Sequence, residues 1–384
     1  MKAAAALVLD AGPEEAAARA AERIFGSLGG QAPTLAVAFA TPHYARRAGS
    51  LVGSLQGELG PVPLIGCVAE WVIGGPREVE TGPAVSLWVA AGTGPVETFS
   101  MQYVKARGGG LFGGYRFEQG SGAHLMICDP FTFPAAELLG HLNDHVPGVT
   151  VIGGMASGGV ADGRSQLFLD GRVITNGAVG ATVAGAHIDL MVSQGCRPIG
   201  NPYTVTQAEG NVLLELGGRA PVQRLQELVK TLPERDRELL ANGGLHVGRV
   251  IDEYRAEQGY GDFLIRSVVG ANAEKGAIVV GDEVEVGQTV QFHVRDSESA
   301  DEDLRGALER EVTALAGQPA AGALLFTCNG RGSRLFSVPD HDASLVSKFL
   351  GEIPSAGIFC AGELGPVGGK NFLHAFTASI AVFG

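Results

Sequence analysis

The residues with the clearest chemical potential lie in FCAGELGPVGGKN (359–371), where a cysteine, a carboxylate and several glycines are close together. A lysine after glycines suggests a phosphate loop, but the motif GxxxxGK followed by Ser or Thr does not fit, because the chain has Leu364 and Asn371 at the deciding positions. Cys360 could be a nucleophile, yet the nearby Glu363 would raise its pKa rather than lower it. We therefore favour a pocket wall, with a cysteine-dependent hydrolase or transferase as the alternative.

A second candidate is Arg331 in CNGRG (328–332). Asn329 and Gly330 account for a tight turn at the end of a strand, which leaves Arg331 to project from the loop. There it could hold a carboxylate with both arms of its guanidinium group. A solvated arginine or a structural salt bridge is the other interpretation.

A third candidate is the segment QFHVRD (291–296), which alternates polar and apolar residues as a strand does. Gln291, His293 and Arg295 share one face, and Asp296 follows them. Solvent exposure and a ligand contact are the two interpretations of that polar face.

Charge and cysteine usage exclude several classes of function. The net charge of −13 and the lack of a basic run with aromatics make nucleic acid an unlikely partner. Five cysteines, far apart and without CxxC spacing, favour reduced thiols in the cytoplasm over disulfides or zinc. His141 and His145 have helical ligand spacing but no visible third ligand. We expect no metal, no cofactor and, since no apolar run approaches about 20 residues, no membrane insertion.

Three stretches share one order of elements: an apolar strand, an amphipathic helix, a short apolar strand, a glycine-rich loop and a closing strand. They begin at TLAVAFA (34–40), AHLMICD (123–129) and GALLFTC (322–328). In the loops, Cys67 and Glu70 correspond to Cys360 and Glu363, which indicates an internal duplication. The middle copy has Gly154 and Ser157 at these positions.

The region between the second and third copies differs. It contains a helical segment, APVQRLQELVKTLP, then short alternating runs that predict β-hairpins, then a helix for which Ser299 or Asp301 would be the N-cap. These patterns together predict a mixed α/β (α+β) protein of two related halves, with extended sheets flanked by helices. We expect domains at residues 1–226 and 227–384.

The chain resembles the FIST family, in which a FIST N-terminal domain precedes a FIST C-domain. The resemblance rests on LIGCVAE and VIGGMASGG in the first half and on GCRPIGNPYTVTQ, VQFHVRD, FTCNGRG and GELGPVGGKNFLHAFTASIAVF in the second. It implies a sensory domain of the kind found in bacterial signal transduction, which recognises an amino acid or a related small polar metabolite. Because the two regions span all 384 residues, we expect a stand-alone cytoplasmic binding protein that acts with a separate signalling protein.

If the ligand is an amino acid, the charged residues near the glycine loops are expected to bind its charged groups. Glu363 and Asp296 would accept the ammonium group, whereas Arg331 and the backbone amides of GPVGG would hold the carboxylate. Cys360 would form part of the pocket wall. A protein-partner scaffold is a further alternative. The full set of expected ligand-binding residues is Arg331, Glu363, Cys360, Asn329, Asn371, Asp296, His293 and Glu70.

Overall fold

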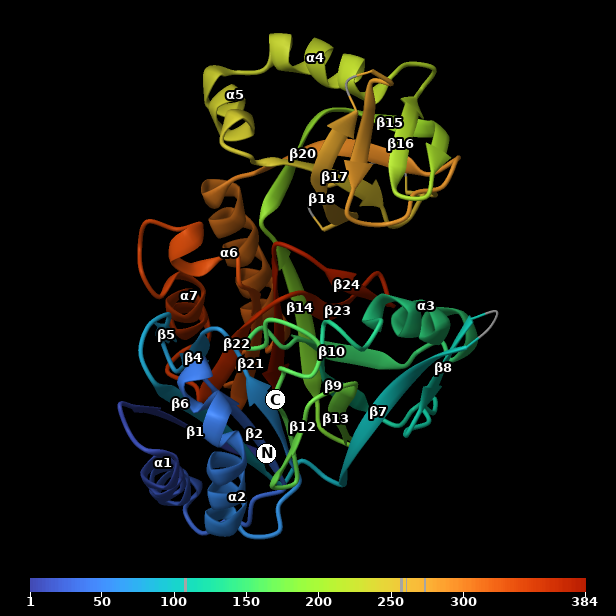
Figure 1. The fold of residues 1–384 in the computed structure, drawn as a ribbon. Coiled ribbons are helices and arrows are strands. Elements are labelled where there is room, and N and C mark those ends of the chain that lie inside the picture. Colours follow the sequence, from blue (N-terminus) through green and yellow to red (C-terminus); the bar gives the residue numbers. More distant parts are fainter. Residues whose placement is uncertain (107–108, 256–257, 260, 273) are drawn as a thin grey trace. The chain divides into compact units, whose positions relative to one another are not determined.

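The computed structural model describes residues 1–106, 109–255, 258–259, 261–272 and 274–384 (Figure 1). Within them the fold is mixed α/β, as the sequence predicted. The chain forms two compact units: residues 1–192 with 304–384 make unit 1, and residues 193–303 make unit 2. This structural division is separate from the sequence boundary at residue 226, which remains a prediction.

Unit 1 contains the predicted repeat three times. In each copy, two parallel strands flank a helix, and a later strand pairs antiparallel with the first strand on its other side. The first copy consists of β2 (Leu35–Ala40), α2 (Ala48–Leu59), β3 (Leu64–Val68) and β6 (Ala84–Ala91). The second consists of β9 (Ala123–Cys128), α3 (Ala135–His145), β10 (Thr150–Met155) and β13 (Ala178–Val183). The third consists of β21 (Gly322–Cys328), α7 (His341–Leu350), β22 (Ser355–Cys360) and β25 (Thr377–Phe383).

The glycine-rich loops of the three copies form hairpins that are exchanged in a cycle. The first copy's hairpin pairs with β22 of the third, the second copy's with β3 of the first, and the third copy's with β10 of the second. Each sheet is therefore completed by a neighbouring copy, so residues far apart in the sequence meet at its edge. The hairpins are β4–β5 (Val72–Gly74 and Arg77–Val79), β11–β12 (Leu167–Leu169 and Arg172–Ile174) and β23–β24 (Glu363–Val367 and Lys370–His374).

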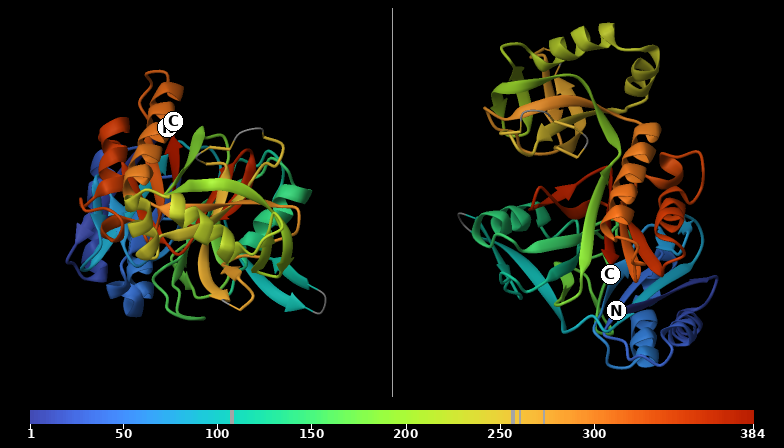
Figure 2. Two further views of the ribbon diagram at one scale, coloured as in Figure 1. Left: turned by 90° about the horizontal axis from the view of Figure 1, so that it is seen from above. Right: turned by 180° about the vertical axis from the view of Figure 1, so that it is seen from behind.

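Helices cover the outer faces of these sheets, while the inner faces share one core. Figures 1 and 2 show α1 and α2 together on one sheet and α6 beside α7 on another. The shared core takes apolar side chains from all three sheets, including Trp88, Ile152 and Phe326. The remaining elements within unit 1 are β1 (Lys2–Leu9), α1 (Pro13–Leu28), η1 (Pro42–Arg47), β7 (Val96–Ala106), β8 (Gly109–Gly113) and η2 (Gly332–Arg334). Two elements, β14 (Ile188–Gln194) and α6 (Ser297–Ala314), run across the boundaries between the units.

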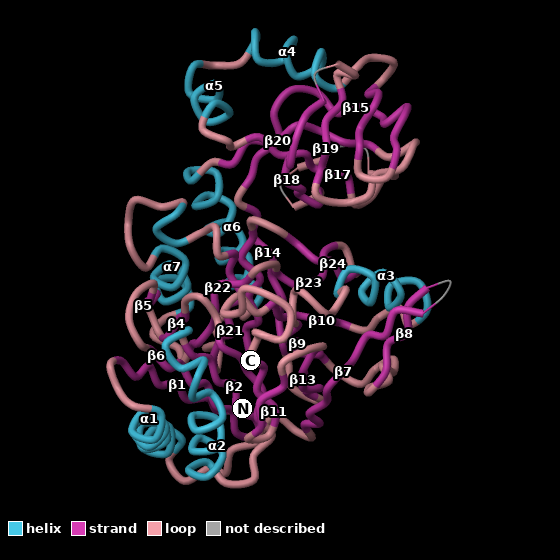
Figure 3. Tube along the Cα trace, in the orientation of Figure 1, coloured by secondary structure: helices cyan, strands magenta, loops and turns pink. Residues whose placement is uncertain are grey.

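Unit 2 is a closed six-stranded barrel, and Figure 3 shows its strands together with two helices. The short alternating runs predicted as hairpins form β18, β19 and β20, three of its six strands, and apolar residues such as Phe292 and Ile278 fill its core. Its elements are β15 (Cys196–Glu209), β16 (Val212–Leu216), α4 (Pro221–Thr231), α5 (Glu234–Ala241), β17 (Leu245–Val250), β18 (Phe263–Asn272), β19 (Ala277–Val280) and β20 (Thr289–Arg295).

Candidate functional site

The three duplicated loops meet at the inner ends of their sheets. Ser157 of the second copy joins the other two, since its hydroxyl accepts the backbone N–H of Glu70 at 2.8 Å and donates to the carbonyl of Phe359. Gly154 stands where the other copies have cysteine. A Cβ there would lie 2.2 Å from Sγ of Cys360, so the close packing of the loops leaves no room for a side chain.

Arg331 lies within the segment that joins β21 to α7, and only 1% of its surface is exposed. Phe336 of the same segment packs on its guanidinium, 5.2 Å from the ring centre. It forms a bidentate pair with Asp342, with Nε to Oδ2 at 2.7 Å and Nη2 to Oδ1 at 2.9 Å. Asp342 also accepts one hydrogen bond from the hydroxyl of Thr327, at 2.7 Å. Burial alone would raise the pKa of Asp342, but the charge and hydrogen bonds of Arg331 hold it well below its usual range. The predicted projecting arginine is thus a buried, paired one.

Glu78, on β5 of the first copy, reaches the N-terminal turn of α7. One carboxylate oxygen accepts the backbone N–H groups of Asp342 and Ala343 at 2.9 and 3.1 Å. Burial, with a contribution from the charge of Asp342, raises the pKa of Glu78 to about 8. The hairpin exchange therefore adds a second acid, from another copy, beside the arginine pair.

Glu363 is fully buried at the start of β23. Its Oε2 accepts the hydroxyl of Thr377 at 2.8 Å and the backbone N–H of the same residue at 3.2 Å. Burial raises the pKa of Glu363 to about 8, although Thr377 and the charge of Arg331 oppose that rise. A pKa raised in this direction favours the neutral carboxylic acid near pH 7, whereas the sequence-based prediction treated the side chain as an anion.

Three atoms of this cluster lack a hydrogen-bond partner among the described residues. They are Nη1 of Arg331, Oε2 of Glu78 and Oε1 of Glu363, and each is buried. Unpaired buried polar atoms are rare in folded proteins, because each costs roughly 1–3 kcal/mol of lost hydration. A small polar ligand that paired with these atoms would recover that cost. We refer to Arg331, Glu78 and Glu363 as the buried polar cluster.

Cys360 is fully buried, and so are Cys67 and Cys128. Burial, followed by the charge of Glu363, raises the pKa of the Cys360 thiol well above its ordinary value. Cys328 lies opposite Cys360 in the pairing of β21 with β22. A thiol in these surroundings stays protonated near neutral pH, which is unfavourable for a nucleophile.

We predict that iodoacetamide at neutral pH leaves Cys67, Cys128 and Cys360 unmodified in the folded protein. Burial denies the reagent access and suppresses the thiolate, so labelling should be on the order of a hundredfold slower than in the urea-unfolded chain. Mass spectrometry of peptides from both samples measures the ratio. Fast and selective labelling of Cys360 would contradict this prediction and favour the cysteine-enzyme alternative.

Glu70 and Asn329 lie beside the buried polar cluster on a more exposed surface. Arg334, which the sequence analysis did not select, binds Glu70 with Nη2 to Oε1 at 2.7 Å and donates to the carbonyl of Asn329 at 2.8 Å. Its guanidinium lies 4.2 Å from the centre of the Trp71 ring. The structure thus brings four expected residues near one another, Arg331, Glu363, Cys360 and Asn329, with Glu70 at the rim.

Asn371 makes contacts that hold β24 to its neighbours. Its Oδ1 accepts the backbone N–H of Val151 at 2.9 Å, and its Nδ2 donates to the carbonyl of Val149 at 2.8 Å. Its backbone N–H donates to Asn143 of α3 at 2.8 Å. These hydrogen bonds give Asn371 a structural role in the sheet.

His293 and Asp296 belong to unit 2. The ring of His293 is fully buried against Phe263, with 4.6 Å between ring centres, and burial lowers its pKa to about 4. Asp296 accepts hydrogen bonds from Arg197 at 3.0 Å and from Arg235 at 2.7 Å. It also accepts the backbone N–H of Glu298 and the hydroxyl of Ser299.

Asp296 therefore caps α6, which begins at Ser297. The predicted N-cap, Ser299 or Asp301, was wrong, because the helix begins at Ser297 and its cap therefore precedes Ser299 by three residues.

In the described residues no group of three or more His, Cys, Asp or Glu side chains is placed to hold a metal. His141 and His145 stack on the exposed side of α3 with 4.3 Å between ring centres. Among the helices that are described, none combines the length and apolar character needed to cross a membrane.

Comparison of the sequence with known protein families identifies two matching domains. The FIST N domain matches residues 34–219, and the FIST C domain matches residues 221–366. The chain belongs to the FIST family. The uncharacterized protein Rv0628c of Mycobacterium tuberculosis is 50% identical over 369 residues, which are 96% of each chain. The uncharacterized protein Mb0898c of Mycobacterium bovis is 46% identical over 370 residues, 96% of this chain and 95% of its own. FIST domains are generally sensory domains of signal transduction.

In this FIST protein the buried polar cluster joins both matched regions. Glu78 comes from the FIST N region, while Arg331 and Glu363 come from the FIST C region. Sequence reasoning missed Glu78, Asp342 and Thr377. The position of Asp342, near the start of an amphipathic segment, indicates only a first-turn acid of a helix. For Glu78 and Thr377 the sequence carries no local signal. Glu78 bonds to residues of another copy, and Thr377 bonds to Glu363 at the far end of the β23–β24 hairpin.

Proposed function

We propose that this FIST protein is a sensory component that binds a small carboxylate-bearing metabolite, an amino acid or a close relative, without forming a covalent bond. One observation supports the proposal above others: the buried polar cluster presents three unpaired polar atoms from three chain segments. A ligand that satisfied all three would bind through hydrogen bonds made in a dry environment, where each is worth more than in water.

The charges of the cluster favour a carboxylate. Nη1 of Arg331 is a permanent donor, and Glu363 and Glu78, whose pKa values are raised to about 8, are also able to donate an O–H at neutral pH. A ligand carboxylate would accept from these groups in charge-assisted hydrogen bonds. An ammonium group on the same ligand would favour the ionised form of Glu363, so its binding would release a proton.

The segment between β21 and α7 covers this cluster. Ser333, in η2, is bonded to Glu80 through both its backbone N–H, at 2.8 Å, and its hydroxyl. Because Arg331 is only 1% exposed and Phe336 of this segment packs on it, entry of a ligand requires the residues that follow Arg331 to move away from the cluster. Opening and closing over a ligand is the kind of change that a sensory domain passes on.

A thermal-shift screen tests the proposal. Both tryptophans, Trp71 and Trp88, lie in unit 1, so their fluorescence reports the unfolding of the unit that holds the cluster. We expect some amino acids or small carboxylates, tested at 10 mM and pH 7, to raise the midpoint by a few degrees, because a ligand at about 100 times its Kd adds roughly 2.7 kcal/mol.

Two conservative variants then test the residues. Glu363→Gln keeps the shape of the side chain, and Arg331→Lys keeps its charge but loses the forked donor. We expect both to reduce the shift produced by each hit at least by half, and the exposed Arg46→Gln to leave it unchanged. If stable Glu363→Gln and Arg331→Lys proteins respond to every hit as the wild type does, the assignment of the site is wrong. The absence of any hit would contradict the ligand class.

A further inference from the structure

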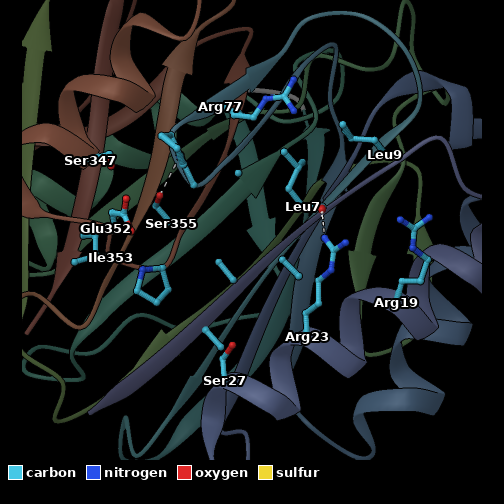
Figure 4. A pocket seen from close by; sticks show the side chains of 17 residues that line it. Leu7, Leu9, Arg19, Arg23, Ser27, Arg77, Ser347, Glu352, Ile353 and Ser355 are labelled. Carbon is cyan, nitrogen blue, oxygen red and sulfur yellow. Dashed lines mark hydrogen bonds between the residues drawn. The ribbon is translucent and has the colours of Figure 1, made fainter.

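A groove with a volume of about 730 Å³ lies along the outer edge of β1. Its walls are β1 itself, one side of α1, the turn between β4 and β5, and the segment between α7 and β22 (Figure 4). The groove belongs entirely to unit 1 and contains no residue of the buried polar cluster. It is a separate feature that the proposed function does not use.

β1 is the last strand of its sheet and, in the described part of the chain, pairs with β6 alone. The N–H of Asp10 donates to Pro83 at 3.0 Å, so in this antiparallel pair the even-numbered residues face β6. The odd-numbered Ala3, Ala5, Leu7 and Leu9 therefore direct their backbone N–H and C=O groups to the outer side. Arg23 confirms this direction, because it donates to the carbonyl of Leu7 at 2.6 Å (Figure 4).

The fold already places a strand at the corresponding edge of another sheet. In the strand order of the three sheets, β1, β7 and β14 hold the same position next to the closing strands β6, β13 and β25. Beyond β7 lies β8, paired with it antiparallel. At the position that corresponds to the outer edge of β1, the second sheet therefore already carries an extra strand. An added strand next to β1 would be compatible with the same fold.

The charges around the groove are mostly positive. Arg19 and Arg23 approach from α1, Arg77 is the first residue of β5, and the one acidic lining residue is Glu352 (Figure 4). This local excess of positive charge is unusual in a chain whose net charge is −13. A negatively charged partner would be attracted to the groove and repelled by much of the remaining surface.

We propose that the outer edge of β1 binds an extended acidic segment of a partner protein as an added β-strand. The six residues from Ala4 to Leu9 span about 20 Å, enough for a peptide of five or six residues. Backbone hydrogen bonds to Ala5, and to Leu7 once the Arg23 side chain leaves the Leu7 carbonyl, would supply the strand pairing. The three arginines would then select acidic side chains. Open strand edges of this kind are a recognised template for pairing with another chain.

Fluorescence anisotropy with a defined peptide tests the proposal. The probe is fluorescein-labelled EVEVEV amide, and the comparison peptides are KVKVKV and two forms of EVEVEV that are N-methylated on alternate residues. We expect EVEVEV to bind with a Kd of tens of micromolar and KVKVKV at least tenfold more weakly. One alternating set of N-methyl groups should abolish binding while the other is tolerated, because an added strand uses every second amide for pairing.

Protein variants complete the test. The double variant Arg23→Glu with Arg77→Glu should weaken EVEVEV binding at least tenfold. The exposed Arg46→Glu makes the same type of charge reversal outside the groove and serves as the control. Ala5→Pro removes an N–H that faces the groove but none that pairs with β6, so the fold should persist with an unchanged thermal midpoint while binding falls.

Several results would overturn the proposal. They are no binding of EVEVEV at 1 mM, equal binding of both N-methylated forms, and full binding by Ala5→Pro or by the double arginine variant. Analytical ultracentrifugation of the unliganded protein, which measures its oligomeric state, could supply a further contradicting result. A dimer that Ala5→Pro dissociates would mean that a second copy of this chain, rather than an acidic partner, occupies the edge.

Discussion

Asp342→Ala is expected to lower the free energy of unfolding of unit 1 by about 3–5 kcal/mol. The substitution leaves the Arg331 guanidinium buried at 1% exposure without its bidentate partner, and it also removes the acceptor of Thr327. An unpaired charge in such a site costs far more than the loss of a surface ion pair. Urea unfolding followed by the fluorescence of Trp71 and Trp88 measures the change in unit 1.

Two further proteins separate the buried charge from a general loss of packing. The double variant Arg331→Met with Asp342→Leu removes both charges and should recover most of the stability, since an apolar pair of similar volume replaces a buried ion pair at little net cost. Glu15→Ala removes an exposed helical pair with Arg19 and should cost less than about 0.5 kcal/mol. A loss below about 1 kcal/mol in Asp342→Ala would show that the pair does not stabilise the fold as argued.

The repeated elements could be predicted from the sequence, because the signals that define them are local. Apolar strands, helices with apolar residues three and four apart and glycine-rich loops recur in all three copies. The exchange of hairpins could not be predicted. Which sheet a hairpin completes depends on how the three copies pack around the shared core, and the residues of β4 pair with β22, nearly 300 positions later in the chain.

The candidate site was predicted in part. Arg331, Asn329, Cys360 and Glu363 lie near one another as expected, because each follows or ends a strand of the third copy. Their environments were not predictable from local sequence. A loop arginine is expected to be exposed, but Phe336 packs on Arg331 and Asp342 of α7 pairs with it. Burial also raises the pKa of Glu363, which favours the neutral acid over the expected anion near pH 7.

The polar face of β20 also shows that burial could not be predicted from the local sequence. The alternation of Gln291, His293 and Arg295 predicted a strand correctly, and exposure of that face was one of its two interpretations. In the barrel, Phe263 packs against His293 and buries it. A period of two specifies which residues share a face, whereas the fold decides whether another element covers that face.

Glu363 should make the stability of unit 1 fall as pH rises from about 5 to about 8. Its pKa in the folded protein is raised to about 8 from an ordinary value of 4.5, so between these values the folded state holds a proton that the unfolded state has released. The stabilisation is complete below the unfolded pKa and is lost as pH rises through the folded pKa. The free energy of unfolding should fall by up to about 1.4 kcal/mol for each pH unit in this range. Between pH 6 and pH 8 the loss due to Glu363 should total roughly 2–3 kcal/mol.

Glu363→Gln isolates this contribution, because glutamine is neutral throughout and Glu78, which titrates in the same range, is unchanged in both proteins. The wild type should gain stability relative to Glu363→Gln as pH falls from 8 to 5.5, whereas the exposed Glu352→Gln should follow the wild type in parallel. Tryptophan-monitored urea unfolding at four pH values provides the curves. Parallel curves for the wild type and Glu363→Gln would mean that Glu363 is ionised in the folded protein. The cluster would then contain an anion beside Arg331, and an ammonium group rather than a carboxylate would be the part of the ligand that it binds.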